Sequence, residues 1–198
     1  IQPLADCPVT VVPMPARRAD PPRYTRSQLG IPASEATFAT IFDYFSVVKR
    51  KNPLGVIDAY REAFAESDGA TLVVKSINGH HRLKSQELVR LAASGRSDIV
   101  LMEDYMSTEQ VRSLVAHSKC LVSMHRSEGY GLNLLDAMAA GVPTIATNYS
   151  GNLAFQNEGN AFLVPWTRVE VGEGAAPYDP RATWAEPDVT AAARAMRT

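Results

Sequence analysis

Two carboxylates stand on either side of a glycine-rich turn in residues 125–141, which read HRSEGYGLNLLDAMAAG. Glu128 precedes the turn, and Gly129 and Gly131 allow the backbone to bend tightly and to approach a ligand closely. Asp136 follows within a segment of helical character. The N–H groups at the start of such a helix suit a phosphate, because the positive end of the helix dipole lies behind them.

The positions of the two carboxylates narrow the class of ligand. Glu128 can reach hydroxyl groups beside the phosphates, and Asp136, about one turn inside the helix, can reach hydroxyl groups farther along. A ligand in which a diphosphate carries a hydroxyl-rich group at each end is a nucleotide sugar, so the two carboxylates indicate this class of ligand. Spacing alone leaves a simpler interpretation open, in which Glu128 caps the helix and Asp136 is a solvated helix residue.

Neither standard nucleotide-binding loop accounts for this stretch. The third glycine of G-x-G-x-x-G is missing, because residue 134 is leucine, and no G-x-x-x-x-G-K-[ST] occurs in the chain. A lone G-x-G is weak evidence, so the interpretation depends on the carboxylates around it.

Alternating strands and helices are expected to position this turn. Apolar runs predict strands at residues 37–45, 70–77, 98–103, 120–125, 143–148 and 161–165, and helical spacing predicts helices at residues 52–66, 85–94, 107–118, 130–141 and 188–197. This alternation predicts right-handed βαβ crossovers, so the fold class is α/β with a doubly wound, parallel, Rossmann-like sheet. Ligands of such sheets bind beyond the carboxyl ends of the strands, where the glycine-rich turn is expected.

Local signals support individual helices. Ser107 and Gln110, three residues apart, predict a capping box at the start of one helix. In the helix at residues 85–94, the spacing places Leu88, Leu91 and Ala92 on a buried face.

Prolines indicate how the chain is organised. Of the thirteen prolines, seven lie within the first 32 residues. We expect residues 1–35 to form a proline-rich connecting arm, with one short β-like run at residues 9–12, and residues 36–198 to form one Rossmann-like domain. After Pro165 the sequence predicts a polar loop before the last helix. The start at Ile1, without methionine, suggests a piece of a longer protein.

Composition excludes several classes of function. The 198 residues carry a formal net charge of -1 and are 45% hydrophobic, which predicts an ordinary globular core and no nucleic acid partner. No apolar run is long enough to span a bilayer, and no signal peptide opens the chain. Cys7 and Cys120 do not form a disulfide framework, so a cytoplasmic location is expected. No cluster has metal-ligand spacing, so neither a metal nor another cofactor is expected.

Longer stretches of the sequence carry a family resemblance. LVSMHRSEGYGLNLLDAMAAGVPTIATNYSGNLAF, residues 121–155, resembles the signature of the group-one (family 4-like) retaining glycosyltransferases of the GT-B fold, whose hallmark is Glu-x7-Glu within an EGFG…EAM segment. Its HRSEGYGL and YSGN elements resemble those of bacterial polysaccharide-type members. VVKRKNPLGVIDAYREAF, residues 47–64, resembles the family's first loop and helix, and TWAEPD, residues 183–188, resembles its tail. The resemblance extends in order over residues 9–197.

The resemblance implies a fold of two Rossmann-like domains and a role for individual residues. This chain looks like the carboxyl-terminal, donor-binding domain, with residues 1–35 as the proline-rich interdomain arm and without the amino-terminal domain that binds the acceptor. Glu128 matches the first glutamate and would orient sugar hydroxyls, while Asp136, shorter than the usual second glutamate, would hold the ribose. Lys51 matches the phosphate-binding lysine. The usual G-R-L ahead of it is replaced by Tyr-Phe-Ser at residues 44–46, and Arg50 is the candidate for the second cation.

The resemblance therefore implies catalytic roles for Glu128, Lys51 and Arg50. Besides Asp136, the donor-binding candidates are the turn residues Gly129, Tyr130, Gly131 and Leu132, the base-pocket residues Tyr105 and Met106, the strand-end residues His125 and Lys75, and Ser150, Gly151 and Asn152 beside the sugar or acceptor.

The implied reaction transfers a sugar to an acceptor hydroxyl with retention of the anomeric configuration. The implied partners are a UDP-, GDP- or ADP-sugar and a glycan or lipid-linked acceptor, with peripheral membrane association of the full-length protein left open. We expect this chain alone to bind donor weakly and to transfer no sugar. No metal is expected to take part.

Other classes of function remain as alternatives. A sugar-nucleotide epimerase or a phosphorylase could share the two-domain plan, although no motif for a pyridoxal-phosphate lysine is present. A non-catalytic nucleotide-binding or signalling domain of receiver type would use Glu103 and Asp104 as its acidic pair. Such a domain also needs acidic residues at the end of its first strand, where Asp43 is followed by Tyr-Phe.

Overall fold

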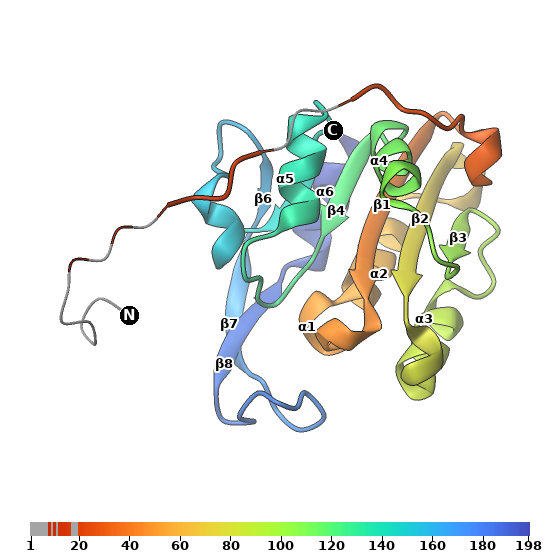
Figure 1. Ribbon diagram of the computed structural model, residues 1–198. Coiled ribbons are helices and arrows are strands. Elements are labelled where there is room, and N and C mark those ends of the chain that lie inside the picture. Colours follow the sequence, from red (N-terminus) through yellow and green to blue (C-terminus); the bar gives the residue numbers. More distant parts are fainter. Residues whose placement is uncertain (1–7, 9, 11, 17–19) are drawn as a thin grey trace.

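The computed structural model describes residues 8, 10, 12–16 and 20–198. At its centre is a six-stranded sheet with the order β3-β2-β1-β4-β5-β6, in which all neighbouring strands are parallel (Figure 1). The strands are β1 (Ala36–Asp43), β2 (Ala70–Ile77), β3 (Ile99–Met102), β4 (Cys120–Ser123), β5 (Thr144–Thr147) and β6 (Phe162–Val164). The predicted doubly wound, Rossmann-like α/β fold is confirmed.

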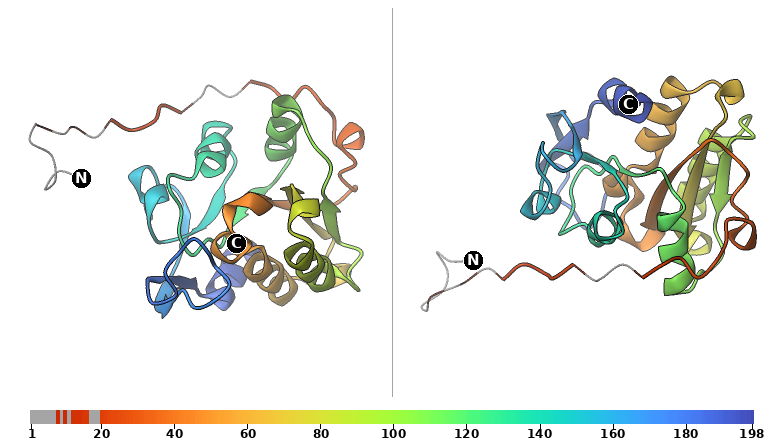
Figure 2. Two further views of the ribbon diagram at one scale, coloured as in Figure 1. Left: turned by 60° about the horizontal axis from the view of Figure 1, so that its bottom comes forward. Right: turned by 90° about the horizontal axis from the view of Figure 1, so that it is seen from above.

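Helices cover both faces of the sheet, as seen from the side at which the strands end (Figure 2, left). One face carries α2 (Pro53–Ala63), α3 (Leu83–Ala93) and α6 (Val189–Arg197), and the other carries α4 (Thr108–Ala116) and α5 (Leu132–Ala139). The short helix α1 (Val48–Lys51) follows β1. Single 3-10 turns lie at Ser27–Leu29, Tyr44–Ser46, Glu66–Asp68, Gly79–His81 and Gly151–Ala154.

Each face of the sheet has its own apolar core, because the side chains of a strand alternate between the faces. Phe38 of β1 packs with Tyr60 and Phe64, and its ring centroid lies 6.3 Å and 5.3 Å from theirs. Ala39, the next residue, packs instead with the cluster around α5 that includes Leu121 and Leu134. The central strands β1, β2, β4 and β5 are therefore buried on both faces, as their apolar sequences predict, whereas Phe162 of the edge strand β6 is 43% exposed.

The order of the strands creates a crevice at the centre of the sheet. The chain runs outward from β1 to β2 and β3, returns to β4 on the other side of β1, and continues outward to β5 and β6. The helices that follow β1 and β4 consequently cover opposite faces, and the loops at the carboxyl ends of these two strands diverge. This is the topological switch point, at which ligands bind in sheets of this class.

The predicted capping box is confirmed at the start of α4. Ser107 Oγ accepts a hydrogen bond from the N–H of Gln110, and Gln110 Oε1 accepts one from the N–H of Ser107. Satisfying both donors stabilises the first turn of the helix.

The predicted polar loop after Pro165 was wrong, because the segment contains an antiparallel hairpin. Its strands are β7 (Trp166–Glu170) and β8 (Thr183–Pro187), and they pair with each other apart from the central sheet. Most side chains of β7 are exposed, so the segment lacks the apolar run by which the other strands were recognised. In β8, Trp184 and Ala185 are buried against neighbouring loops.

The predicted buried face of α3 was also wrong. Leu88 and Leu91 are 56% and 67% exposed, whereas Gln86 and Val89 point into the protein. Gln86 is stable inside because its amide Nε2 donates a hydrogen bond to Glu103 Oε1 at 2.8 Å. The helix therefore turns a mixed face inward and leaves these two leucines in solvent.

Part of the expected arm packs on the domain. Leu29 and Ile31 are buried against Val73 and Leu114. The boundary near residue 35 and the interdomain role of the arm stay predictions. Two residues of the expected β-like run, Val9 and Val11, lie outside the described residues, as does Cys7, and Thr10 and Val12 are not in a strand. Each helix in the described part of the chain is too short or too polar to cross a membrane.

Candidate active site

The glycine-rich turn joins β4 to α5, at the switch point. Gly131 is the N-cap of α5 and has a φ of 94°, a conformation that favours glycine. The first backbone hydrogen bond of the helix runs from Leu135 N to Gly131 O at 3.0 Å, so the N–H groups of residues 132–134 precede the helical ladder. These groups form the predicted amide cradle, although the helix begins two residues later than the sequence predicted.

Lys51 and Glu128 form an ion pair beside this cradle. Lys51 Nζ lies 2.5 Å from Glu128 Oε2, and Arg50 Nη1 lies 3.6 Å from Glu128 Oε1. Burial raises the pKa of the Glu128 carboxyl, but the hydrogen bond and charge of Lys51, with the charge of Arg50, outweigh that effect and hold it below its usual value. The structure thus brings together all three residues for which a catalytic role was predicted.

Arg50 lies behind Glu128 and is bound to the backbone of the turn. Its Nη1 donates to Ser127 O at 2.7 Å, and its carbonyl oxygen accepts from Arg126 N at 2.8 Å. Its Nε is buried and has no hydrogen-bond partner among the residues that the structure describes. Lys51 is therefore the cation of this pair that lines the cavity described below.

The side chain of buried Asn52 fixes the backbone next to Lys51. Asn52 follows α1 with a φ of 54°, and its Oδ1 accepts from Gly55 N at 3.2 Å, which caps α2. Its Nδ2 donates to Met124 O at 2.9 Å, at the end of β4. This one side chain joins the end of α1, the start of α2 and the beginning of the glycine-rich turn.

The loop after β5 supports Glu128 from the other side. Ser150 Oγ accepts a hydrogen bond from Glu128 N at 2.7 Å, and Gly151 N donates to Glu128 O at 3.0 Å. A Cβ on Gly151 would lie 2.1 Å from Gly129 O, so only glycine allows this approach. Ser150 has φ 75° and ψ -141°, a conformation that is costly for any residue but glycine and that is often found at functional sites.

His125 and Asn152 lie beneath the site. Neither has exposed surface, so a ligand would touch neither without a change of structure. His125 Nε2 lies 3.1 Å from both Tyr149 O and Asn152 Oδ1, and its Nδ1 lies 2.9 Å from Ser123 Oγ. Burial lowers the pKa of His125, so the ring is neutral and donates from Nε2. These contacts hold the loop after β5.

Two neighbouring cavities occupy the switch point. The first, which we call the turn cavity, has a volume of about 460 Å³, and the second, which we call the side cavity, has a volume of about 300 Å³. Both are lined by Lys51 and Asn133. Predicted residues that line the turn cavity are Lys51, Glu128, Gly129, Tyr130, Gly131 and Leu132, and those that line the side cavity are Lys51, Lys75, Tyr105 and Met106. Neither lining includes Asp136, a half-buried residue of α5.

Lys75 lines the side cavity, but it is buried and its ammonium group already donates hydrogen bonds within the protein. It is 2% exposed, and its Nζ donates to Ser76 O and to Asp104 O, each at 2.7 Å. Burial lowers the pKa of this ammonium group. The contact with Asp104 O anchors the loop of Tyr105, whose side chain is 85% exposed.

Several residues of the site were missed by the sequence interpretation. Asn133 lines both cavities, Asn52 joins three segments, and Arg126 binds Glu186 of β8. Arg126 and Glu186 both stand within the quoted motifs, but nothing in the sequence indicates that they pair. Asn52 adjoins Lys51, and its place before Pro53 is the only local signal for its capping role.

The signalling alternative loses support from the contacts of its proposed acidic residue Glu103. Glu103, proposed for the signalling alternative, receives hydrogen bonds from Arg90 and Gln86. In the described part of the chain, no group of three or more His, Cys, Asp or Glu side chains is placed to hold a metal ion.

A parallel sheet of this order defines a Rossmann-like α/β domain, and its amide cradle and Lys–Glu pair lie at the switch point, where ligands bind in sheets of this class. The chain belongs to the glycosyl transferases group 1 family, whose model matches residues 28–171. A search of curated proteins finds no match to the sequence.

Solved structures share the fold. The carboxyl-terminal domain of a group 1 family glycosyl transferase from Francisella tularensis is 20% identical, with a TM-score of 0.55 over 73% of this chain and 76% of that one. WaaG, a glycosyltransferase of lipopolysaccharide biosynthesis, is 18% identical, with a TM-score of 0.57 over 87% of this chain and 40% of that one. Alr3699/HepE of Anabaena, crystallised with UDP and glucose, is 16% identical, with a TM-score of 0.59 over 71% and 37%. Identities this low show the fold alone.

Proposed function

We propose that this chain is the donor-binding half of a retaining glycosyltransferase that moves a sugar from a nucleoside diphosphate to an acceptor hydroxyl. The observation that carries the proposal is the Lys51–Glu128 pair at the amide cradle of α5, at the sheet's switch point. Membership of the group 1 family supports the transferase class, and the UDP and glucose bound by the Anabaena neighbour support a nucleotide-sugar donor.

The two cavities suggest how a donor would lie. The diphosphate would lie between Lys51 and the N–H groups of residues 132–134, where both cavities meet. The sugar would enter the turn cavity beside Glu128, and the base would enter the side cavity beside Tyr105 and Met106. Asp136 would reach the ribose only if its side chain turned toward the side cavity.

Charge stabilisation is the main catalytic contribution that these residues would make. Departure of the nucleoside diphosphate places negative charge on its terminal phosphate, and Lys51 with the helix amides is arranged to stabilise it. Glu128 would accept hydrogen bonds from sugar hydroxyls and so orient the reacting carbon. We assign no nucleophile to the chain, and we propose that no metal takes part.

The proposal also covers the acceptor and the place of the reaction in the cell. We propose that the acceptor is a glycan or a lipid-linked glycan in the synthesis of a bacterial polysaccharide or glycoconjugate, and that a preceding domain of the full-length protein binds it. The reaction would then take place in the cytoplasm, with the full-length protein at the membrane surface when the acceptor is lipid-linked. The present chain alone would bind donor without transferring sugar.

Calorimetry with UDP, GDP and ADP tests the proposal directly. We expect the chain to bind one of them more tightly than the others, and Lys51→Ala to weaken that binding by about tenfold or more, because an ionic contact to a phosphate is lost. Lys84→Ala is the matched control, since Lys84 is an exposed lysine of α3 that lines neither cavity. Indifference of the wild-type chain to all three nucleotides would refute the proposal.

A further inference from the structure

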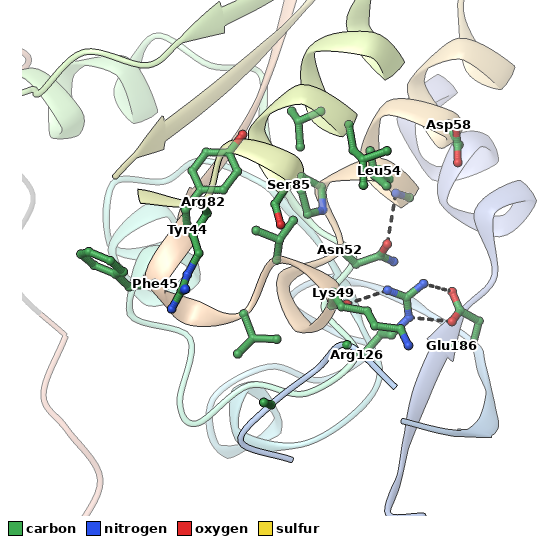
Figure 3. Close-up of a pocket in the computed structure, with 18 of the residues that line it drawn as sticks. Tyr44, Phe45, Lys49, Asn52, Leu54, Asp58, Arg82, Ser85, Arg126 and Glu186 are labelled. Atoms are coloured by element: carbon green, nitrogen blue, oxygen red, sulfur yellow. Dashed lines mark hydrogen bonds and ion pairs between the residues drawn. The ribbon is translucent and has the colours of Figure 1, made fainter. Parts of the chain in front are cut away.

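Three segments of the chain meet at the guanidinium group of Arg126. Its Nε and Nη2 donate to the two carboxylate oxygens of Glu186 in β8, at 2.6 Å and 2.8 Å. Its Nη1 donates to Lys49 O in α1 at 2.6 Å (Figure 3). The planar fork of an arginine suits this bidentate contact and leaves one nitrogen for the third partner.

The main chain of Arg126 takes part in the same junction. Arg126 N donates to Arg50 O at 2.8 Å, and Arg126 O accepts from Ala185 N at 3.0 Å. Arg126 therefore lies between α1 and β8 through both its backbone and its side chain. Lys51 directly follows Arg50, whose carbonyl oxygen makes one of these contacts, and Glu128 lies two residues after Arg126 in the sequence.

The hairpin also holds the start of α1. Val47, which precedes this helix, has a φ of 53° and packs against the buried cluster of Val171, Ala175 and Trp184. Lys49 Nζ donates to Val171 O at 2.7 Å. A β-branched residue rarely adopts a positive φ, so packing by the hairpin is required to maintain this geometry.

Arg126 and Glu186 do not line the turn cavity. They line a third cavity of about 820 Å³, which we call the hairpin cavity and which lies between α1, α3 and the hairpin (Figure 3). Lys51 and Glu128 are absent from its lining. Any effect of this ion pair on the ligand of the turn cavity must therefore pass through α1 and the glycine-rich turn.

We propose that Arg126 and Glu186 are positioning residues, which join the hairpin to α1 and the glycine-rich turn and so set the separation of Lys51 and Glu128. The inference rests on the proposed function, because it assigns the pair a part in donor binding. Without the carboxylate of Glu186, Arg126 loses two of its three side-chain hydrogen bonds. The segments that carry Lys51 and Glu128 are then joined to β8 through the backbone of Arg126 but without this ion pair.

The test uses the whole 198-residue chain and two variants. Glu186→Gln removes the charge with little change of shape, and Arg126→Lys keeps the charge but loses the fork. We expect each variant to weaken binding of the tightest of UDP, GDP and ADP by about tenfold. Asp68→Asn is the matched control, because Asp68 forms an ion pair with Arg197 at 2.6 Å and neither residue lines any of the three cavities. It should leave the dissociation constant unchanged.

A double-mutant cycle separates positioning from general loss of structure. If Glu186 acts through Lys51, Glu186→Gln should weaken binding by less than about twofold in a Lys51→Ala background. A merely structural role would give the same tenfold loss in both backgrounds, and that result would overturn the inference. Thermal melting confirms that the variants are folded at the temperature of the titration.

The remaining outcomes distinguish this inference from the proposed function. If the wild-type chain binds none of the three nucleotides, both fail. If it binds one and Lys51→Ala weakens binding, but Glu186→Gln and Arg126→Lys do not, only the inference fails. Where Glu186→Gln does not fold, Arg126→Lys in the two backgrounds decides the question in the same way.

Discussion

At the scale of single residues, Lys51 and Glu128 neutralise each other before any ligand is present. A diphosphate that approaches Lys51 must compete with a carboxylate 2.5 Å away, and sugar hydroxyls that approach Glu128 must compete with an ammonium group. Both charges are mostly buried, so they are screened less by salt than an exposed pair would be. The pair thus favours a ligand that offers an anion and hydroxyl groups together.

Glu128→Gln should change the response to the two parts of the donor in opposite directions. We expect nucleoside diphosphate to bind equally or more tightly, because Lys51 is no longer neutralised. The additional affinity of an intact nucleotide sugar should fall by about tenfold, since hydrogen bonds to a charged acceptor are stronger than those to an amide. Calorimetry with UDP and a UDP-sugar, or with the matching pair for another base, measures both. Equal weakening of both ligands would contradict the role given to Glu128.

The neutral state of His125 predicts acid sensitivity. Burial lowers the pKa of His125 below 6.5, so the unfolded chain takes up a proton that the folded chain rejects. The stabilisation is complete above the unfolded pKa and is lost as the pH falls toward the folded pKa. Urea unfolding should show the free energy of unfolding falling by up to about 1.4 kcal/mol per pH unit below pH 6.5. His125→Gln should show a smaller slope over this range.

The other histidines are present in both the wild-type chain and the His125→Gln variant. Their contribution to the pH dependence of unfolding therefore cancels when the two slopes are compared. An unchanged slope in His125→Gln would mean that another group controls the acid response.

At the scale of elements, regular patterns made most of the sheet and its helices predictable. The second predicted strand, residues 70–77, coincides with β2, because its apolar centre, Leu72–Val74, lies between turns that contain glycine and polar residues. The hairpin β7–β8 has no such run, since most side chains of β7 are exposed and the buried residues of β8 belong to a short segment apart from the central sheet. For α3, the pattern indicated the face with Leu88 and Leu91, whereas the inward face includes Gln86, whose partner Glu103 is distant in the sequence.

The same distinction applies to the site. Lys51 and Glu128 could be predicted individually from their motifs, but they are 77 residues apart, and only the sheet order makes them neighbours. Burial of Lys75, His125 and Asn152 could not be predicted, because their neighbours come from separate loops. The roles of the predicted residues toward a donor stay predictions.

The loop after β5 yields a test at this scale. Gly151→Ala places a Cβ 2.1 Å from Gly129 O, which is backbone and cannot turn aside. We expect the variant to lose about 3 kcal/mol of stability or more in urea unfolding, because the two loops must separate. Gly129→Ala is the contrasting variant, since a Cβ at that position meets open space and should cost far less. Similar losses in the two variants would show that close packing of these loops is unimportant.

At the scale of the whole molecule, the candidate site and a buried polar network lie at opposite edges of the parallel sheet. The carboxyl edge holds the strained residues Val47 and Ser150, the paired charges and the cavities. The opposite edge is held by a buried polar network. Arg96 pairs with Asp98 at the start of β3, and Tyr60 donates to Asp98 Oδ2 at 2.9 Å. Stability and ligand binding should therefore respond to mutation separately at the two edges.

Asp98→Asn tests this separation. Removing the charge leaves Arg96 buried without its carboxylate, which should cost about 3 kcal/mol of unfolding free energy at pH 7. The hydrogen bonds from Arg96 are the main cause of the lowered pKa of Asp98, with a further contribution from Tyr60. The stabilisation from Asp98 is therefore present above its unfolded pKa and is lost as the pH falls through the folded one, so the two proteins should become closer in stability below about pH 4.

The affinity of Asp98→Asn for nucleoside diphosphate should equal that of the wild-type chain, because neither cavity at the switch point is lined by Tyr60, Arg96 or Asp98. Urea unfolding at pH 7 and at a series of pH values from about 4 downward, with calorimetry at pH 7, measures the two properties on the same samples. A loss of affinity in the folded variant would mean that strain passes along the strands from one edge of the sheet to the other. The sheet would then act as one rigid body in binding, and the donor site could not be treated as a property of its own loops.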